Sequence, residues 1–132
     1  MTRINADIDP STLHRRHLIA ELREITMVPA ALKRSLRTKS KEDILRSIPK
    51  TYTLGTGHVR FFYDKQKFLA NRFMKLIAEM ERRAYSPDRL RITAFNGFDP
   101  EFNNDWKATD AANALVQSRI NERIQQKRHL YT

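Results

Sequence analysis

Cysteine is absent from this 132-residue chain, and glycine and long apolar runs are scarce. The lack of cysteine excludes a disulfide framework, a thiol nucleophile and a thiolate-ligated zinc site. With three glycines and five prolines, the chain is neither collagen-like nor loop-rich. No segment approaches the roughly 18 consecutive apolar residues of a membrane-spanning helix, and none resembles a secretory signal. We therefore expect one domain, residues 1–132, with no membrane partner and a cytoplasmic location.

Positive charge is what the chain has in excess. It contains 25 Lys and Arg against 15 Asp and Glu, which gives a net charge of +10. The excess lies in residues 11–50, 65–91 and 117–132, whereas residues 92–116 are net negative. Such a distribution favours a polyanion as partner, because each neutralised phosphate releases condensed counterions. Charge thus predicts nucleic-acid binding; the alternative is a helical protein whose basic faces meet only water.

The first helical pattern begins at Asp9-Pro10, where Asp9 suits the N-cap and proline suits the first helical position. Pro29 should kink this helix, because proline removes an intrahelical hydrogen bond. Ser40 resembles the N-cap of a short helix that ends near Arg46. The apolar side of the first helix is predicted to contain Leu13, Leu18, Ile19, Leu22 and Ile25.

A second long helix is predicted from about Phe61 to Ala84, ended by Ser86-Pro87. Residues 88–107 look irregular. A third helix follows Thr109, with an apolar row beside a basic row at i, i+4 and i+8. We assign His58, Phe61, Phe62, Tyr63 and Trp106 to the core. The fold class predicted is all-α: a compact single domain of three main helices, the first one kinked.

Few side-chain patterns point to chemistry. Gly55-Thr56-Gly57 lacks the rest of a phosphate-binding loop. His14 and His17 lie three apart, but the neighbouring arginines would repel a cation, so no metal site and no cofactor are expected.

The start of the chain offers another kind of nucleophile. Thr2 is small, so Met1 should be removed, which leaves an α-amine with a reference pKa of about 7.7–8.0. Cations such as Arg3 and Arg23 would lower that pKa further. A neutral amine can attack the sugar C1′ of DNA and form an imine. Many chains that begin Met-Thr expose the same group, so this feature alone does not single out an enzyme.

Three ordered blocks of sequence carry a resemblance to a known family. They are Met1-Thr2-Arg3-Ile4-Asn5, the stretch from His17 to Ile25 (HLIAELREI), and the stretch from Gly57 to Lys65 (GHVRFFYDK). Glu101-Phe102-x-x-Asp105 and the last helix match more weakly. Together they resemble the pyrimidine-dimer DNA glycosylases with abasic-site lyase activity, of the T-even phage endonuclease V type.

The resemblance implies a monomeric all-α enzyme, with its N-terminus threaded between the helices, that acts on double-stranded DNA containing damaged bases. By position, Thr2 would supply the attacking amine and Glu24 the catalytic carboxylate. A carboxylate suits a cationic sugar, and flanking cations suit phosphates. The expected DNA-binding residues are Arg3, Arg16, His17, Arg23, Arg119, Arg123 and Lys127.

The sequence also departs from the family pattern. Arg16 and Met27 stand where the phage enzyme has glutamine and arginine. The family's aromatic C-terminal tail is reduced to Lys127-Arg128-His129-Leu130-Tyr131-Thr132. Two alternatives therefore stay open: a glycosylase for another damaged or modified base, and a non-catalytic helical DNA-binding protein on the same scaffold.

Overall fold

The computed structural model describes residues 3–131, and within them the chain is all-α, as predicted. An isolated bridge between Lys65 and Asn103 is the only β-type pairing found in this range. The α-helices are α1 (Arg15–Ile25), α2 (Met27–Leu36), α3 (Lys41–Ser47), α4 (His58–Phe61), α5 (Gln66–Arg82) and α6 (Asp110–Gln126). Short 3-10 helices are η1 (Pro10–Thr12), η2 (Arg89–Phe95), η3 (Pro100–Phe102) and η4 (Arg128–Leu130).

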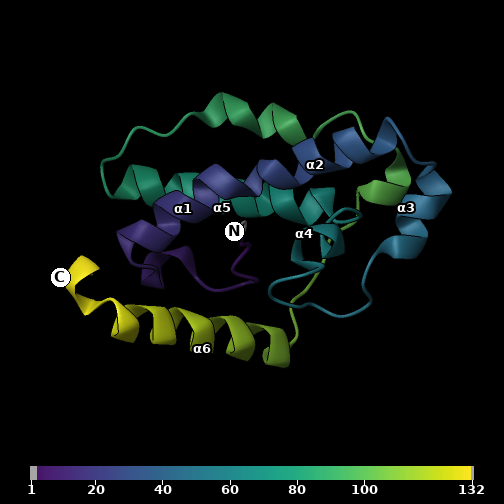
Figure 1. The fold of residues 1–132 in the computed structure, drawn as a ribbon. Coiled ribbons are helices and arrows are strands. Elements are labelled where there is room, and N and C mark those ends of the chain that lie inside the picture. Colours follow the sequence, from purple (N-terminus) through teal and green to yellow (C-terminus); the bar gives the residue numbers. More distant parts are fainter. Residues whose placement is uncertain (1–2, 132) are drawn as a thin grey trace.

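Helix α5 lies at the centre of the fold. It contacts α1, η1 and η2, while α2 contacts α3, α4 and η2. Figure 1 shows α1 and α2 crossing α5 as one bent rod, with α6 running below this layer. The purple segment that precedes α1 lies between α6 and the upper helices, so residues 3–14 pass between elements that are far apart in the sequence. No helix within residues 3–131 is long and apolar enough to cross a membrane.

The kink predicted in the first helix is confirmed, and it divides the rod into α1 and α2. The break is at Thr26, three residues before Pro29, which has no N–H to donate to the carbonyl of Ile25. Arg91 donates to Thr26 Oγ1 at this point and so ties the break to η2.

The predicted start of the first helix is wrong. Asp9 does cap a turn, since its Oδ1 accepts the N–H of Ser11 at 2.9 Å, but that turn is only η1. The α-helix begins at Arg15, where His14 Nδ1 accepts the N–H of Arg16 at 3.1 Å. Leu13 is extended and buried between the two elements. Arg83 donates to carbonyls of this segment, which are then unavailable to a continuous helix.

The second predicted helix is also interrupted. It begins earlier than expected, at His58, and breaks after Phe61 before resuming as α5. The Asp64 carbonyl accepts the backbone N–H of Asn104 at 3.2 Å and its side-chain amide at 2.8 Å. In a continuous helix, this carbonyl would instead accept a backbone N–H of the next helical turn. Lys65 Nζ similarly donates to the Phe61 carbonyl at 2.8 Å. These tertiary contacts set the break, and sequence periodicity does not report them.

Capping residues at α3 and α6 are confirmed where the sequence placed them. Ser40 accepts the N–H of Asp43 and Thr109 accepts the N–H of Ala112. Residues 88–107 are less irregular than predicted, because η2 and η3 lie within them.

The predicted core is largely correct, with one clear exception. His58, Phe61, Phe62 and Tyr63 are buried, and Trp106 packs against them in an aromatic cluster. Ile19, placed on the apolar side of the first helix, is instead 43% exposed. On a helix, Ile19 lies 100° from Leu18, and here that rotation turns it out of the core.

A buried ion pair holds the segment before η1 against the helices. Arg72 of α5 donates to both oxygens of Glu21 of α1, at 2.8 and 3.0 Å, and to the Ile8 carbonyl at 2.6 Å. Asn5 adds its backbone N–H and its side-chain amide to the same carboxylate, at 3.2 and 2.8 Å. From the other side, Ile4 donates its N–H to His58 Nε2 at 2.8 Å. Residues 3–8 are therefore fixed between α1, α4 and α5; the predicted threading of the terminus itself concerns residues 1–2, which lie outside the described residues.

Replacing Arg72 with Met should destabilise the fold strongly, because Glu21 would remain buried without its partner. We expect the free energy of unfolding to fall by about 3–5 kcal/mol in urea denaturation. The matched control is Arg46→Met, which removes an exposed ion pair with Asp43 and should cost about 0–0.5 kcal/mol. A loss below about 1 kcal/mol for Arg72→Met would contradict the importance given to this pair.

Candidate active site

A cationic hollow of about 550 Å³ opens between α1, α6 and the C-terminal tail. Most of the side chains that the sequence singled out line it. The lining residues are Arg3, Asn5, Arg16, His17, Ile19, Ala20, Glu21, Arg23, Glu24, Arg119, Ile120, Arg123 and Tyr131. The fold thus brings the first residues of the chain together with a helix more than a hundred residues away.

Glu24 lies at the point where the start of the chain meets α1. Its Oε2 accepts the backbone N–H of Arg3 at 3.3 Å, and the side chain is only partly buried. Glu21, one turn earlier, is 1% exposed and fully engaged by Arg72 and Asn5. The two carboxylates therefore have different situations: Glu21 is neutralised inside the protein, and Glu24 faces the hollow.

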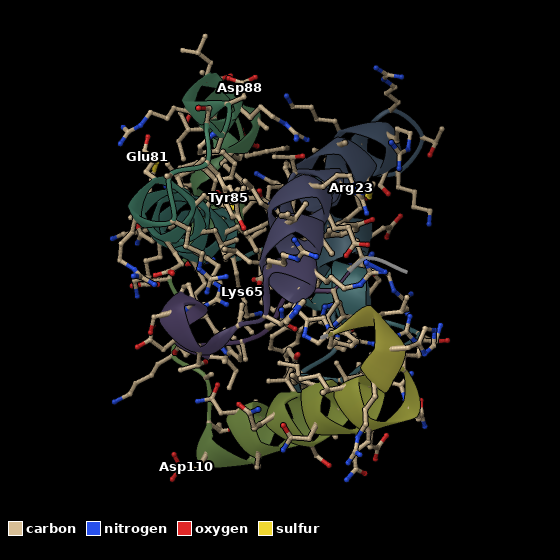
Figure 2. All side chains as sticks on the ribbon, turned by 90° about the vertical axis from the view of Figure 1, so that its left-hand side faces the viewer. Arg23, Lys65, Glu81, Tyr85, Asp88 and Asp110 are labelled. Carbon is tan, nitrogen blue, oxygen red and sulfur yellow. The ribbon has the colours of Figure 1, made fainter. Side chains whose placement is uncertain are left out.

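Five arginines line the same hollow as this carboxylate. Arg16, Arg23 and Arg123 are exposed and form no ion pair with any residue between 3 and 131. Arg119 has one weak partner, Glu122 at 3.5 Å, and burial together with the field of Arg119 lowers the pKa of Arg3. In Figure 2, Arg23 lies on the flank of α1 away from Glu81 of α5. Such unpaired guanidinium groups suit the oxygens of an anion such as phosphate.

The C-terminal tail closes one edge of the hollow. The hydroxyl of Tyr131 lies 2.7 Å from His17 Nε2, and its ring packs edge-on against His14 at 4.7 Å between centroids. Burial, followed by the charges of His14 and Arg3, lowers the pKa of His17, so its imidazole is neutral at pH 7. His17 Nδ1 is buried without a hydrogen-bond partner among the described residues. The tail is short, yet its tyrosine reaches the site.

Sequence reasoning missed several residues of the hollow. Asn5 and Glu21 stood inside the matched blocks, but nothing in their spacing indicated that they bind each other. Tyr131 was seen only as the remainder of an aromatic tail. Asn5 is 4% exposed, and its Oδ1 has no partner among residues 3–131, because the Glu21 carboxylate fixes the amide with its Nδ2 toward α1. The feature that marks Glu21 is its pairing with Arg72, a buried arginine on α5. Only the tertiary structure reveals this pairing.

The hollow as described does not include two of the predicted site residues. Thr2, the expected nucleophile, lies outside the described residues. Lys127 is the C-cap of α6 and does not line the hollow, so its contact with DNA stays a prediction. Within residues 3–131, no group of three His, Asp or Glu side chains is arranged to hold a metal ion.

The fold and the hollow define a class of protein: a small, basic, all-α protein with a carboxylate set among arginines. Comparison with known families makes the identity specific. The family model described as pyrimidine dimer DNA glycosylase matches residues 1–93, and the chain therefore belongs to this family. Its function is that of a DNA repair glycosylase for pyrimidine dimers, and its partner is DNA that contains them. Helix α6 and the tail lie beyond the matched residues, so the structure places Arg119, Arg123 and Tyr131 in the hollow independently of the family match.

Binding to DNA should weaken steeply with salt if the five arginines of the hollow contact phosphates. The slope of log K against log salt concentration should be about −4 to −5. Arg123→Gln should make that slope shallower by about one and leave lesion preference unchanged. Arg89→Gln, a change at an arginine paired with Glu81 away from the hollow, is the control and should leave the slope unaltered. An affinity that does not depend on salt would show that these arginines are not the binding surface.

Proposed function

We propose that this protein both removes the dimerised base and cleaves the resulting abasic site, with the α-amine of Thr2, freed by loss of Met1, as its nucleophile. The observation that carries this proposal is the hydrogen bond between the Arg3 backbone N–H and Glu24. The α-nitrogen of residue 2 is three covalent bonds from that N–H, so the two nitrogens lie within about 4 Å in any conformation. A terminal amine on Thr2 is thereby tethered close to the carboxylate.

The chemistry follows from these two groups. The amine lone pair forms a bond to C1′ while the glycosidic bond breaks and its electron pair leaves with the base. Positive charge develops on the sugar, and the Glu24 carboxylate stabilises it. The sugar ring then opens to an imine between the amine and C1′. Removal of a proton from C2′ expels the phosphate at C3′ and cleaves the strand, and Glu24 assists these proton transfers.

Opposing charges set the protonation of the amine. Its reference pKa of about 7.7–8.0 already leaves a neutral fraction near pH 7. The arginines of the hollow disfavour the ammonium form, whereas Glu24 favours it. The balance of these opposing charges sets how much of the amine is neutral and nucleophilic near pH 7.

The surrounding cations have a separate task. In this proposal Arg3, Arg23 and Arg119 hold the phosphates on either side of the damaged nucleotide. Arg16, His17, Arg123 and Lys127 extend the contact. A damaged base pair is easier to unstack than an intact one, which lowers the cost of turning a nucleotide toward the hollow. We propose that a single chain performs the reaction on double-stranded DNA in the cytoplasm, without metal or organic cofactor.

Trapping with borohydride tests the nucleophile directly. The protein is mixed with dimer-containing or abasic duplex DNA and borohydride, which reduces an imine to a stable covalent adduct. We expect an adduct on both substrates, undiminished by a metal chelator, and an intact mass that lacks Met1. A preparation that retains Met1 should give no adduct. An adduct from that preparation would contradict the assignment of the Thr2 amine, and no adduct from any preparation would overturn the imine mechanism.

The shortened tail makes the range of substrates a separate question. The same trapping assay with other damaged or modified bases decides it, because the imine forms only at a sugar whose base the protein has displaced. An adduct with another base and none with the dimer would identify a relative that has changed its lesion.

Two substitutions separate the roles of the proposed catalytic groups. Glu24→Gln keeps the size of the side chain and removes its charge, so base excision should slow by ~10²-fold or more. Binding should hold or tighten, because an anion beside phosphates is lost. Thr2→Ser should be nearly normal, because the nucleophile is the backbone nitrogen. Glu42→Gln, at an exposed position on α3, serves as control. Wild-type excision by Glu24→Gln, or its loss in Thr2→Ser, would show that these roles are wrong.

A further inference from the structure

Ile19 is one of several large apolar residues that the core leaves exposed. It belongs to the rim of the hollow, with 43% of its surface exposed. The rest of the rim on α1 is charged or polar apart from Ala20. Phosphate contacts need cations and hydrogen-bond donors, so an exposed isoleucine here serves a different part of a nucleic acid.

The neighbours of Ile19 on α1 indicate which part. Arg16 precedes it by three residues and Arg23 follows it by four, so all three lie on one face of the helix. Both arginines are exposed and have no ion pair within residues 3–131. Seven residues of helix separate them by about 10 Å. That separation is comparable with the width of the major groove of B-DNA, about 12 Å, and the long arginine side chains can make up the difference. The arginines can therefore hold phosphates on opposite sides of a groove, and Ile19 then faces the bases between them.

We propose that Ile19 is an apolar wedge that enters the base stack beside the lesion and opens it. This inference rests on the proposed action on duplex DNA. Apolar side chains that insert between base steps unstack them partially, and the protein contacts made on the opened DNA offset the cost. The Ile19 side chain would enter at the base step that contains the lesion, where stacking is already weakened. The phosphate contacts of Arg16 and Arg23 would fix how far it enters the stack.

Other exposed apolar residues do not share this setting. Met27 is 46% exposed and Leu115 is 46% exposed, but neither lines the hollow. Leu115 lies on α6, four residues before Arg119. Leu115→Ala is therefore a matched control: it removes an equally exposed aliphatic side chain near the site, from outside the rim.

The wedge proposal predicts different effects of an Ile19 substitution on dimer-containing DNA and on DNA with an abasic site. Excision of a dimerised base requires that the stack be opened, whereas an abasic site has no base to displace. Ile19→Ala should thus slow base excision by ~10-fold or more, a modest part of the unstacking free energy. Cleavage of a preformed abasic site should change by less than about 2-fold, since phosphate contacts and the amine are untouched. A purely structural role for Ile19 would reduce both activities together.

Fluorescence reports the opening itself, independently of catalysis. A duplex with 2-aminopurine at the step beside a thymine dimer should brighten when the wild-type protein binds, because an unstacked 2-aminopurine is no longer quenched. Ile19→Ala should bind with a similar salt dependence but fail to brighten the probe. Ile19→Met should restore the signal, because it again supplies a long apolar side chain, and Leu115→Ala should behave as wild type.

The outcomes separate the wedge from the proposed chemistry. Brightening that needs Ile19, without a borohydride adduct, supports the wedge and overturns the amine mechanism. An adduct together with equal brightening by wild type and Ile19→Ala overturns the wedge alone. No brightening by the wild-type protein also overturns the wedge, whatever the adduct shows.

Discussion

The contact on which the site depends is the buried pair between Glu21 and Arg72. Two charges removed from water are stabilising only when their own donors and acceptors find partners, and here Asn5 donates to the Glu21 carboxylate while the Ile8 carbonyl accepts from Arg72. The network therefore joins three parts of the chain that would not otherwise meet: the first residues, α1 and α5. Because residue 5 is held beside Glu21, residue 3 is held beside Glu24, one helical turn further on. The position of the start of the chain is thus a result of core electrostatics.

The same arrangement explains why two glutamates three residues apart have different properties. Glu21 points into the protein and is neutralised by a guanidinium with which it makes two hydrogen bonds. Glu24 points to the hollow, where its only hydrogen bond with a described residue comes from a backbone N–H. The arginines around it remain available, since none of Arg16, Arg23 and Arg123 is committed to an ion pair within residues 3–131. A carboxylate and several guanidinium groups without ion pairs can therefore exist in one small volume.

Periodicity and capping signals located most of the helices correctly, because these are local properties of the chain. The kink near Pro29 and the caps at Ser40 and Thr109 follow from backbone hydrogen bonding within a few residues. The errors occur where distant groups take over a backbone carbonyl: Arg83 at the segment before α1, and Asn104 at the break after α4. Ile19 shows the related limit of side-chain patterns. A hydrophobic side chain indicates that a residue can be buried. Only the packing of the helices decides which residues on a wide apolar side of a helix face the core.

The sequence by itself determined the all-α class, the basic character and, through its three matched blocks, the family. It also named Glu24 and the arginines as candidate site residues. These are properties of residue type and order. The tertiary structure decided how these residues meet: that α6 adds Arg119 and Arg123 across from α1, that Tyr131 reaches His17, and that Arg72 neutralises Glu21. It alone revealed an isoleucine exposed between two arginines. Distances between residues far apart in sequence are set by the packing of the whole chain, and local sequence patterns do not predict them.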